Sequence, residues 1–241
     1  MNAPETLVVS PEGGVSAYKD ALKKQAHALL EPIVRALLAI GLKADHLTGL
    51  GFLLCVAAGL EFALGRFRLA ATIATLAGVC DILDGQVARQ SGTVTRFGAF
   101  LDSTLDRFAE AALFVGIAFF YMFSLVDMAS NPARVIANLQ HELEPVTWAF
   151  IALFAMLALV GSFMVSYSRA RAEGLGLECK VGWFERPERM VLLIIAGFAG
   201  LGPVMPAALI LLVVFSFATA IQRMAHVWKL TRKSGSSSTE V

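Results

Sequence analysis

Long apolar runs alternate with short polar stretches along most of the chain. A membrane-spanning helix needs roughly 20 predominantly apolar residues. Six runs approach or exceed this length, at about residues 46–64, 69–83, 97–126, 146–167, 190–201 and 206–226. The fifth run is short unless Trp183 and Phe184 join it, and Gly202-Pro203 predicts a tight turn before the sixth. The pattern predicts an all-α integral membrane protein with six transmembrane helices.

The segment before the first run has a different pattern. Between residues 17 and 38 the apolar positions recur at helical spacing, and Lys23, Lys24 and Arg35 supply a basic side. This pattern predicts an N-terminal amphipathic helix that lies in the membrane interface. The alternative is a seventh, poorly apolar spanning helix. We expect one membrane domain over residues 17–231, with disordered tails at residues 1–16 and 232–241.

Composition agrees with a membrane protein and excludes several other classes. Hydrophobic residues make up 57% of the 241 residues and charged residues only 16%, whereas soluble domains carry about 25% charged residues. Disordered chains are poor in apolar residues, so this class is excluded. Three cysteines give no disulfide framework. The net charge is +1 and no nucleic-acid motif is present, so we expect no nucleic-acid partner.

Lysine and arginine residues predict the orientation in the membrane. With six crossings and both termini in the cytoplasm, every lysine and arginine except Arg66, Arg68 and Arg134 falls on the cytoplasmic side. Cytoplasmic loops carry such an excess of positive charge. We therefore expect a multi-pass protein of the cell inner (plasma) membrane, with the cytoplasmic ends of the helices holding the functional site.

Four aspartates interrupt the apolar pattern within a short segment. Asp81 and Asp84 are three residues apart, and Asp102 and Asp106 are four apart, so each pair shares one helix face. Residues 90–93 form a polar turn signal, which would join two antiparallel helices and let the acidic faces meet. Facing carboxylates repel unless cations lie between them, and oxygen ligands suit Mg²⁺ or Mn²⁺. We expect two Mg²⁺ ions here, an arrangement typical of phosphoryl transfer.

Small and basic residues beside the aspartates fit a phosphate ligand. Gly85 has no side chain, so a diphosphate could approach the helix backbone there. Arg89 could pair with a phosphate through two hydrogen bonds. Gly98 and Ala99 would let the second helix pack closely. Charges near membrane depth are usually functional, and we prefer this interpretation to a set of helix-end charges.

The complete motif is Asp81-x2-Asp84-Gly85-x2-Ala88-Arg89-x8-Gly98-x3-Asp102-x3-Asp106. It resembles the signature of the CDP-alcohol phosphotransferases, the class I CDP-alcohol phosphatidyltransferase family, at every fixed position. The resemblance implies a six-helix membrane enzyme, usually a homodimer with an N-terminal interfacial helix. Such enzymes pass a phosphoalcohol from a CDP-alcohol to a second alcohol and release CMP.

Four further segments are similar to the bacterial phosphatidylinositol phosphate synthases within this family. They are residues 41–48, 166–173, 184–189 and 222–228. The subgroup often has proline where this chain has Ala44, and lysine where it has Arg169. Arginine and lysine bind phosphate with different geometry.

The resemblance also implies roles for individual residues. Asp81, Asp84, Asp102 and Asp106 would bind the metals, and Asp106 would also be the general base. The CDP-lipid would contact Asp45, His46, Leu47, Thr48, Gly85, Arg89 and Thr95. The phosphate of the acceptor would bind Arg169, Arg189 and Arg223. Taken alone, Asp45 and Thr95 could be helix caps. We expect Arg171 and Arg186 to pair with Glu173, Glu185 and Glu188 instead.

These roles predict an enzyme of phospholipid biosynthesis in contact with membrane lipids. CDP-diacylglycerol would donate its phosphatidyl group to an inositol phosphate, giving phosphatidylinositol phosphate and CMP. The alternative acceptor is glycerol 3-phosphate, which would give phosphatidylglycerophosphate. An alternative of a different class is an ion-coupled membrane transporter whose carboxylates bind the ion. Ion sites of transporters usually lie near the membrane midplane within broken helices.

Overall fold

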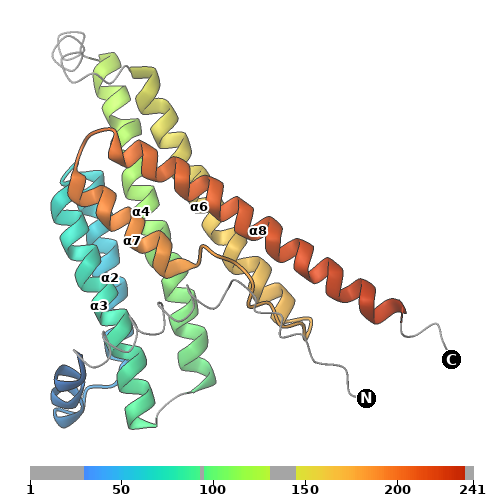
Figure 1. Ribbon diagram of the computed structural model, residues 1–241. Helices are drawn as coiled ribbons and strands as arrows, with labels where there is room; N and C mark the ends of the chain where they lie inside the picture. The colour runs from blue at the N-terminus through green and yellow to red at the C-terminus, as the bar shows by residue number, and fades with distance from the viewer. Residues whose placement is uncertain (1–29, 93–94, 131–144, 237–241) are drawn as a thin grey trace, which may run out of the picture.

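A computed structural model describes residues 30–92, 95–130 and 145–236, and these ranges contain helices and no strand. Residues 30–39 are helical. The helices that follow are α2 (Ala44–Ala63), α3 (Phe67–Ser91), α4 (Arg96–Ser130), α6 (Pro145–Glu173), α7 (Arg186–Ala199) and α8 (Val204–Ser236). They form the elongated bundle of Figure 1. The all-α prediction is confirmed for the described residues, and each of the six apolar runs lies in a helix.

Four of these helices are long and apolar enough to cross a membrane. They are residues Ala44–Ala63, Arg96–Ser130, Val146–Glu173 and Val204–Arg232. Helix α3 carries the charged residues of the motif in its C-terminal half. Helix α7 has 14 residues, about 21 Å at 1.5 Å per residue, against a hydrocarbon core of about 30 Å. Six complete crossings therefore remain a prediction.

The predicted ends of the domain are described only in part. Residues 30–39 confirm helix in the second half of the expected amphipathic segment, while residues 1–29 and 237–241 lie outside the described part. Helix α8 continues to Ser236, beyond residue 232, where the C-terminal tail is expected to start, and the domain bounds stay a prediction. The Arg232 guanidinium lies 4.8 Å from the ring centroid of Trp228, and positive charge is favourable at a helix C-terminus.

Helix α2 lies at the centre of one half of the bundle and packs against both α3 and α4. The contact with α4 is a backbone contact between glycines. A Cβ atom on Gly116 would lie 2.0 Å from the carbonyl oxygen of Gly59, and one on Gly59 would lie 2.4 Å from that of Ala112. Small residues allow such close approach between membrane helices. The same helix thereby fixes the positions of α3 and α4, which carry the two halves of the motif.

The other half of the bundle is built on α4 and α6. Helix α6 packs against α4 and α8, while the short α7 contacts α3 and α8. Aromatic side chains from α3, α4 and α6 fill the core nearby, with ring centroids of Phe67 and Phe120 5.1 Å apart and those of Tyr121 and Trp148 5.5 Å apart. Gly200 ends α7 with a φ of 79°. The predicted turn at Gly202-Pro203 is confirmed, since α8 begins at the next residue.

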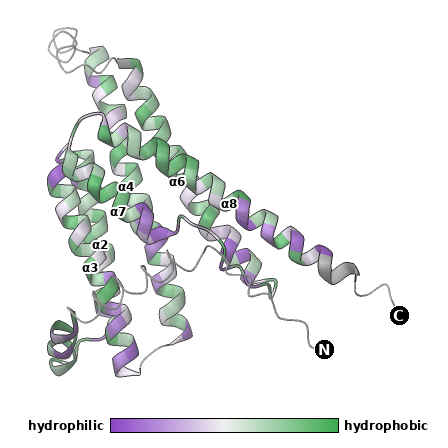
Figure 2. Ribbon diagram, in the orientation of Figure 1, coloured by the Kyte–Doolittle hydropathy of each residue, from purple (hydrophilic) through white to green (hydrophobic). Residues whose placement is uncertain are grey.

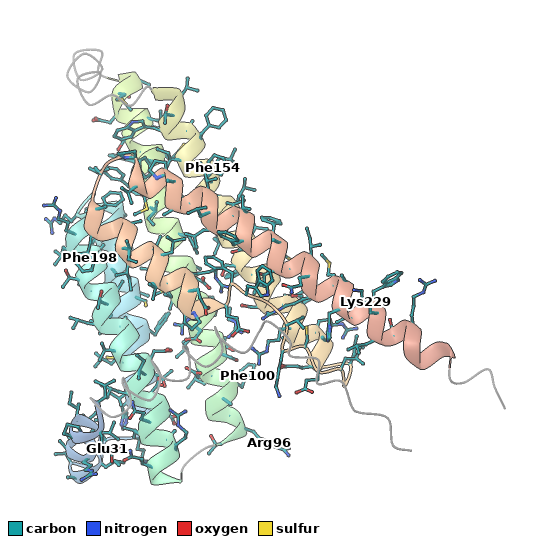
Figure 3. All side chains as sticks on the ribbon, viewed as in Figure 1. Glu31, Arg96, Phe100, Phe154, Phe198 and Lys229 are labelled. Carbon is teal, nitrogen blue, oxygen red and sulfur yellow. The ribbon has the colours of Figure 1, made fainter. Side chains whose placement is uncertain are left out.

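Polar and apolar residues separate along the bundle. Figure 2 shows hydrophobic residues along the helix shafts, with hydrophilic residues gathered at the C-terminal end of α3, the start of α7 and the outer end of α8. Large apolar side chains such as Leu53, Phe119 and Phe163 remain exposed on the shafts. Figure 3 places Glu31, Arg96 and Phe100 toward one end, and Phe154 toward the other. This distribution is typical of an integral membrane protein.

Candidate active site

Three aspartates meet where the polar ends of α3 and α4 face one another. Carboxylate oxygens of Asp81, Asp102 and Asp106 all lie within 4.8 Å of one another. Asp81 comes from α3 and the other two from α4, one turn apart. Because both helices pack on α2, their acidic faces converge, as the spacing predicts.

The fourth aspartate of the motif is held beside this group. Asp84 is buried, and its Oδ2 accepts a hydrogen bond of 2.8 Å from the hydroxyl of Thr48 on α2. It does not share the 4.8 Å cluster of the other three. The hydroxyl of Thr48 therefore orients an acidic group instead of facing outward.

The donor set of the three aspartates fits a divalent cation. Carboxylate oxygens are the ligands that Mg²⁺ and Mn²⁺ prefer. Three carboxylates this close are mutually repulsive, so a cation between them is electrostatically favourable. Asp84 lies about one helical turn from Asp81 on the same face of α3.

Arg186 lies inside the acidic cluster, which the sequence analysis did not predict. Its Nη1 is 2.8 Å from Asp81 Oδ1, and its Nη2 is 2.9 Å from Asp106 Oδ1. We expected Arg186 to pair with nearby glutamates, and this expectation is wrong. The two partners are far away in the chain, separated from Arg186 by 105 residues in the case of Asp81, so only helix packing brings them together.

Arg189, predicted to bind the acceptor phosphate, is engaged within the protein. Its Nε and Nη2 donate hydrogen bonds of 2.7 and 3.0 Å to the two carboxylate oxygens of Glu110. Its Nη1 donates to the carbonyl of Phe184 at 3.3 Å. The side chains of Arg189 and Glu110 are only 1% and 2% exposed. This pair joins α7 to α4 and leaves Arg189 little capacity for a ligand.

Glu110 is a site residue that the sequence analysis missed. It follows Asp106 by four residues, as Asp106 follows Asp102, so the three acids lie along one face of α4. That spacing was available in the sequence. The partner of Glu110 was not, because 79 residues separate it from Arg189.

The other two predicted phosphate-binding arginines converge on one carboxylate. Glu185 Oε1 lies 3.1 Å from Arg223 Nη2 and 3.5 Å from Arg169 Nη1. Arg223 is buried and also donates to the carbonyls of Val181 and Val165. Arg169 is partly exposed and also pairs with Glu173 at 2.9 Å. Two guanidinium groups from α6 and α8 thus surround one anionic group.

Arg89 and Gly85, both predicted to contact the CDP-lipid, lie next to each other. A Cβ atom on Gly85 would be 3.3 Å from Arg89 Nη1. The exposed guanidinium of Arg89 therefore lies over the bare backbone of Gly85. A phosphate approaching that backbone would meet the arginine at the same place.

Two other predicted CDP-lipid residues meet at the start of α4. Thr95 Oγ1 accepts a hydrogen bond of 2.9 Å from the backbone N–H of Gly98, as a helix N-cap does. Asp45 Oδ1 would lie 3.6 Å from a Cβ atom on Gly98. Asp45 is not the cap of α2, because the N-cap residue is Lys43.

His46 and Leu47 have structural contacts at the start of α2. His46 Nδ1 accepts a hydrogen bond of 3.4 Å from the backbone N–H of Lys43. Leu47 is only 4% exposed and packs in a small apolar cluster with Val34, Leu83 and Val87. Its side chain joins α2 to α3 and to the preceding helix, so it faces the core.

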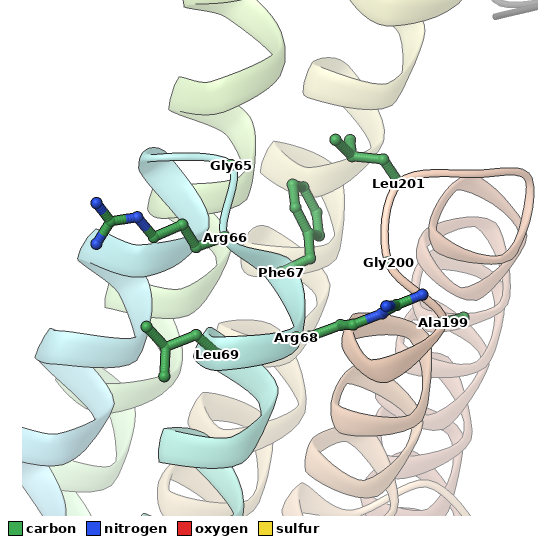
Figure 4. A pocket seen from close by; sticks show the side chains of 8 residues that line it. All are labelled: Gly65, Arg66, Phe67, Arg68, Leu69, Ala199, Gly200 and Leu201. Atoms are coloured by element: carbon green, nitrogen blue, oxygen red, sulfur yellow. The ribbon is translucent and has the colours of Figure 1, made fainter.

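A pocket lies elsewhere in the bundle, beside the turns before α3 and after α7. Gly65–Leu69 and Ala199–Leu201 line it, and Figure 4 shows the side chain of Arg68 extending toward Gly200. None of the residues predicted from the motif lines this pocket. The motif residues instead gather at the polar ends of α3 and α4.

Comparison with known proteins places this arrangement in a family. Residues 42–228 match the family described as CDP-alcohol phosphatidyltransferase. The chain belongs to this family. It is accordingly a phosphatidyltransferase, a membrane enzyme built from helices, as the resemblance of the motif implied.

Two curated relatives are similar over most of the chain. The archaetidylinositol phosphate synthase of Methanothermobacter thermautotrophicus is 38% identical over 193 residues, covering 79% of this chain and 85% of the relative. The phosphatidylinositol phosphate synthase of Mycobacterium tuberculosis is 35% identical over 204 residues, covering 82% of this chain and 84% of the relative.

Crystal structures of the Mycobacterium tuberculosis phosphatidylinositol phosphate synthase have a similar fold. The one with CDP-DAG bound matches with a TM-score of 0.67 and 32% identity, covering 82% of this chain and 92% of that chain. The complex with manganese and citrate matches with a TM-score of 0.68 and 32% identity, covering 82% and 88% of the two chains.

Proposed function

We propose that this enzyme transfers the phosphatidyl group of CDP-diacylglycerol to an inositol phosphate, giving phosphatidylinositol phosphate and CMP. The observation that carries the proposal is the cluster of Asp81, Asp102 and Asp106, whose oxygens lie within 4.8 Å of one another. This cluster joins both halves of the family motif. The relative of known structure that binds CDP-DAG supports the same donor here.

The four aspartates would bind the metal ions, and one of them would also act as the general base. Asp81, Asp84, Asp102 and Asp106 would hold two Mg²⁺ ions, or Mn²⁺, which when bound neutralise charge on the diphosphate and on the leaving CMP. The manganese complex of the similar synthase supports this assignment. Asp106 takes the proton of the attacking acceptor hydroxyl as the general base.

The CDP-lipid would lie along the starts of α2 and α4 and the end of α3. Arg89 binds a diphosphate oxygen above Gly85, which gives the phosphate access to the backbone. Asp45 and Thr95, which meet at Gly98, border the same region. His46, Leu47 and Thr48 support it indirectly, through the start of α2 and through Asp84. The acceptor hydroxyl attacks the β-phosphorus and CMP leaves, so that positioning provides most of the catalysis.

The acceptor phosphate would bind between Arg169 and Arg223. Both guanidinium groups already surround the Glu185 carboxylate, so the protein builds an anion site at this place. Arg189 would act through Glu110, by holding α7 and therefore Glu185 in position. The names of the archaeal and bacterial relatives both end in inositol phosphate synthase and differ only in the lipid part. This supports inositol phosphate over glycerol 3-phosphate as the acceptor.

Release of CMP by the purified protein in detergent tests the proposal. The reaction contains CDP-diacylglycerol and Mg²⁺, with myo-inositol 1-phosphate, glycerol 3-phosphate or free inositol in parallel. We expect CMP release with inositol phosphate alone. Release with glycerol 3-phosphate alone would keep the chemistry and overturn the acceptor. No release with any of the three would contradict inositol phosphate as the acceptor and point to a different acceptor alcohol.

The location follows from the same site. We propose a homodimer in the inner (plasma) membrane, with the aspartate cluster and both termini in the cytoplasm. The basic residues near the site support this orientation. Fusing a fluorescent protein or a periplasm-dependent phosphatase to the C-terminus tests it, and an active phosphatase would overturn it. Mass measurement in detergent tests the dimer.

A further inference from the structure

The guanidinium group of Arg186 contacts two of the three aspartates in the acidic cluster. It contacts Asp81 Oδ1 at 2.8 Å and Asp106 Oδ1 at 2.9 Å, and thus bridges α3 and α4. The side chain is 24% exposed. A positive charge at this place partly neutralises the same carboxylates that would hold a divalent ion.

Local helix preference does not explain an arginine at this position. Arg186 is the first residue of α7, where the helix dipole favours negative and disfavours positive charge. The favourable partners come only from the tertiary structure. The side chain is therefore placed by attraction to the aspartates.

Not every donor of Arg186 is satisfied in this arrangement. Its Nε is buried and has no hydrogen-bond partner among the described residues. A buried donor without a partner costs free energy. The free energy of this side chain would therefore fall if Nε gained a hydrogen-bond acceptor. It would also fall if the guanidinium moved into water.

The helix that carries Arg186 is held in place by a second arginine. Arg189, three residues later on α7, is fixed to Glu110 by two hydrogen bonds of 2.7 and 3.0 Å. Helix α7 therefore stays in place when the Arg186 side chain changes its partners.

We propose that Arg186 is a built-in counterion of the metal site, which a divalent ion displaces from Asp81 and Asp106 when it binds. The inference rests on the proposed function only in that it takes this cluster as the metal site. It adds that protein and metal compete for the same carboxylates. Without the ion, Arg186 keeps α3 and α4 from repelling each other.

Binding of Mn²⁺ to the full-length protein in detergent, without lipid or acceptor, tests the inference. Electron paramagnetic resonance measures free Mn²⁺ during a titration, so no enzymatic activity is needed. We expect R186Q to bind Mn²⁺ about threefold or more tightly than the wild type, the size of a partly exposed ion pair. We expect R186K, which keeps the charge, to lie between them.

Two further variants make the result specific. R171Q removes an exposed arginine of α6 with the same change of charge, and we expect it to bind Mn²⁺ as the wild type does. D81N should weaken binding in both the wild-type and R186Q backgrounds, which locates the ion in the cluster.

Each outcome decides the question. Unchanged or weaker Mn²⁺ binding in R186Q would overturn the inference and show that Arg186 shapes the site for the ion. An equal gain in R171Q would show a general charge effect and would also overturn it. If R186Q does not fold, R186K with binding equal to the wild type or weaker decides against it. CMP release is measured independently of Mn²⁺ binding. Failure of the proposed function can therefore be distinguished from failure of this inference.

Discussion

Asp106 is the residue on which the proposed chemistry depends most. It lies between Asp102 and Glu110 on one face of α4, and its Oδ1 is 2.9 Å from Arg186. Its carboxylate thus pairs with a positive charge of the protein, which a bound divalent ion is proposed to replace.

Replacing Asp106 with asparagine should remove the base and a metal ligand together. We expect CMP release to fall by at least about 100-fold, because general base catalysis contributes roughly 10²–10⁴-fold. The measurement is initial rate at saturating substrates, with binding of the CDP-lipid followed separately. Asp127→Asn, the same substitution near the other end of α4, is the control. A D106N enzyme with the full rate would show that another group takes the proton.

Among the elements, α7 depends most on side-chain contacts for its position. It has only 14 residues, and its first turn carries both Arg186 and Arg189. Each arginine joins it to the acidic face of α4, and Arg186 also to α3. Glu185, directly before α7, binds Arg169 and Arg223. The two anion-binding regions of the site are therefore joined through the start of one helix.

Removing Arg189 should destabilise the bundle more than it alters chemistry. Arg189→Met leaves the carboxylate of Glu110 buried and unpaired, which typically costs about 3–5 kcal/mol. Thermal unfolding in detergent should show a large fall in Tm. The double variant Glu110→Leu/Arg189→Met should recover part of it, since neither charge is then left alone.

An exposed pair provides the control for this prediction. Arg66 and Glu61 are 3.3 Å apart, with Arg66 62% exposed, and Arg66→Met should leave Tm nearly unchanged. If Arg189→Met keeps the wild-type Tm and instead raises the acceptor KM, Arg189 contacts the acceptor directly, as the family resemblance implied.

The crossing of α2 and α4 should tolerate no added side chain. Gly116→Ala would place a methyl group 2.0 Å from the carbonyl oxygen of Gly59, so the helices must separate. Overpacking costs about 1–3 kcal/mol, which lowers Tm by roughly 2–10 °C in a chain of this size. Gly78→Ala in α3 has open space around it, and alanine favours helix. It should therefore leave Tm unchanged or raise it, and an equal fall in both variants would contradict the prediction.

At the scale of the whole molecule, the bundle brings charged residues from α3, α4, α6, α7 and α8 to one polar region. The helix shafts around this region are apolar and exposed, as Figure 2 shows. A membrane around the shafts would leave the charged region at its boundary. The lipid donor and the polar acceptor proposed above would then reach the same aspartates from the membrane and from water.

Metal removal should affect both activity and global stability. Chelation with EDTA should abolish CMP release, and Mg²⁺ or Mn²⁺ should restore it. An ion that binds only the folded state adds about 2.7 kcal/mol at 100 times its Kd, so Mg²⁺ should raise the Tm of the EDTA-treated protein. Asp81→Asn/Asp102→Asn should lose this rise, whereas Glu178→Gln, an exposed loop acid, should keep it. A rise that persists in the double aspartate variant would place the ion elsewhere.

The sequence alone determined the elements and the acidic half of the site. Apolar runs of sufficient length predict helices because the spacing of apolar residues is a local property of the sequence. Spacings of three and four residues place Asp81 with Asp84, and Asp102 with Asp106, on shared faces whatever the rest of the fold. Glu110 could have been added by the same spacing.

Only the tertiary structure decided which arginine meets which acid. Arg186 and Arg189 are three residues apart, so local spacing cannot distinguish a partner of one from a partner of the other. Their partners lie 105 and 79 residues away for Asp81 and Glu110, and the pairing depends on how α7 is placed against α3 and α4. Helix packing sets that placement through side-chain volumes and close glycine contacts across the bundle, which no single segment contains.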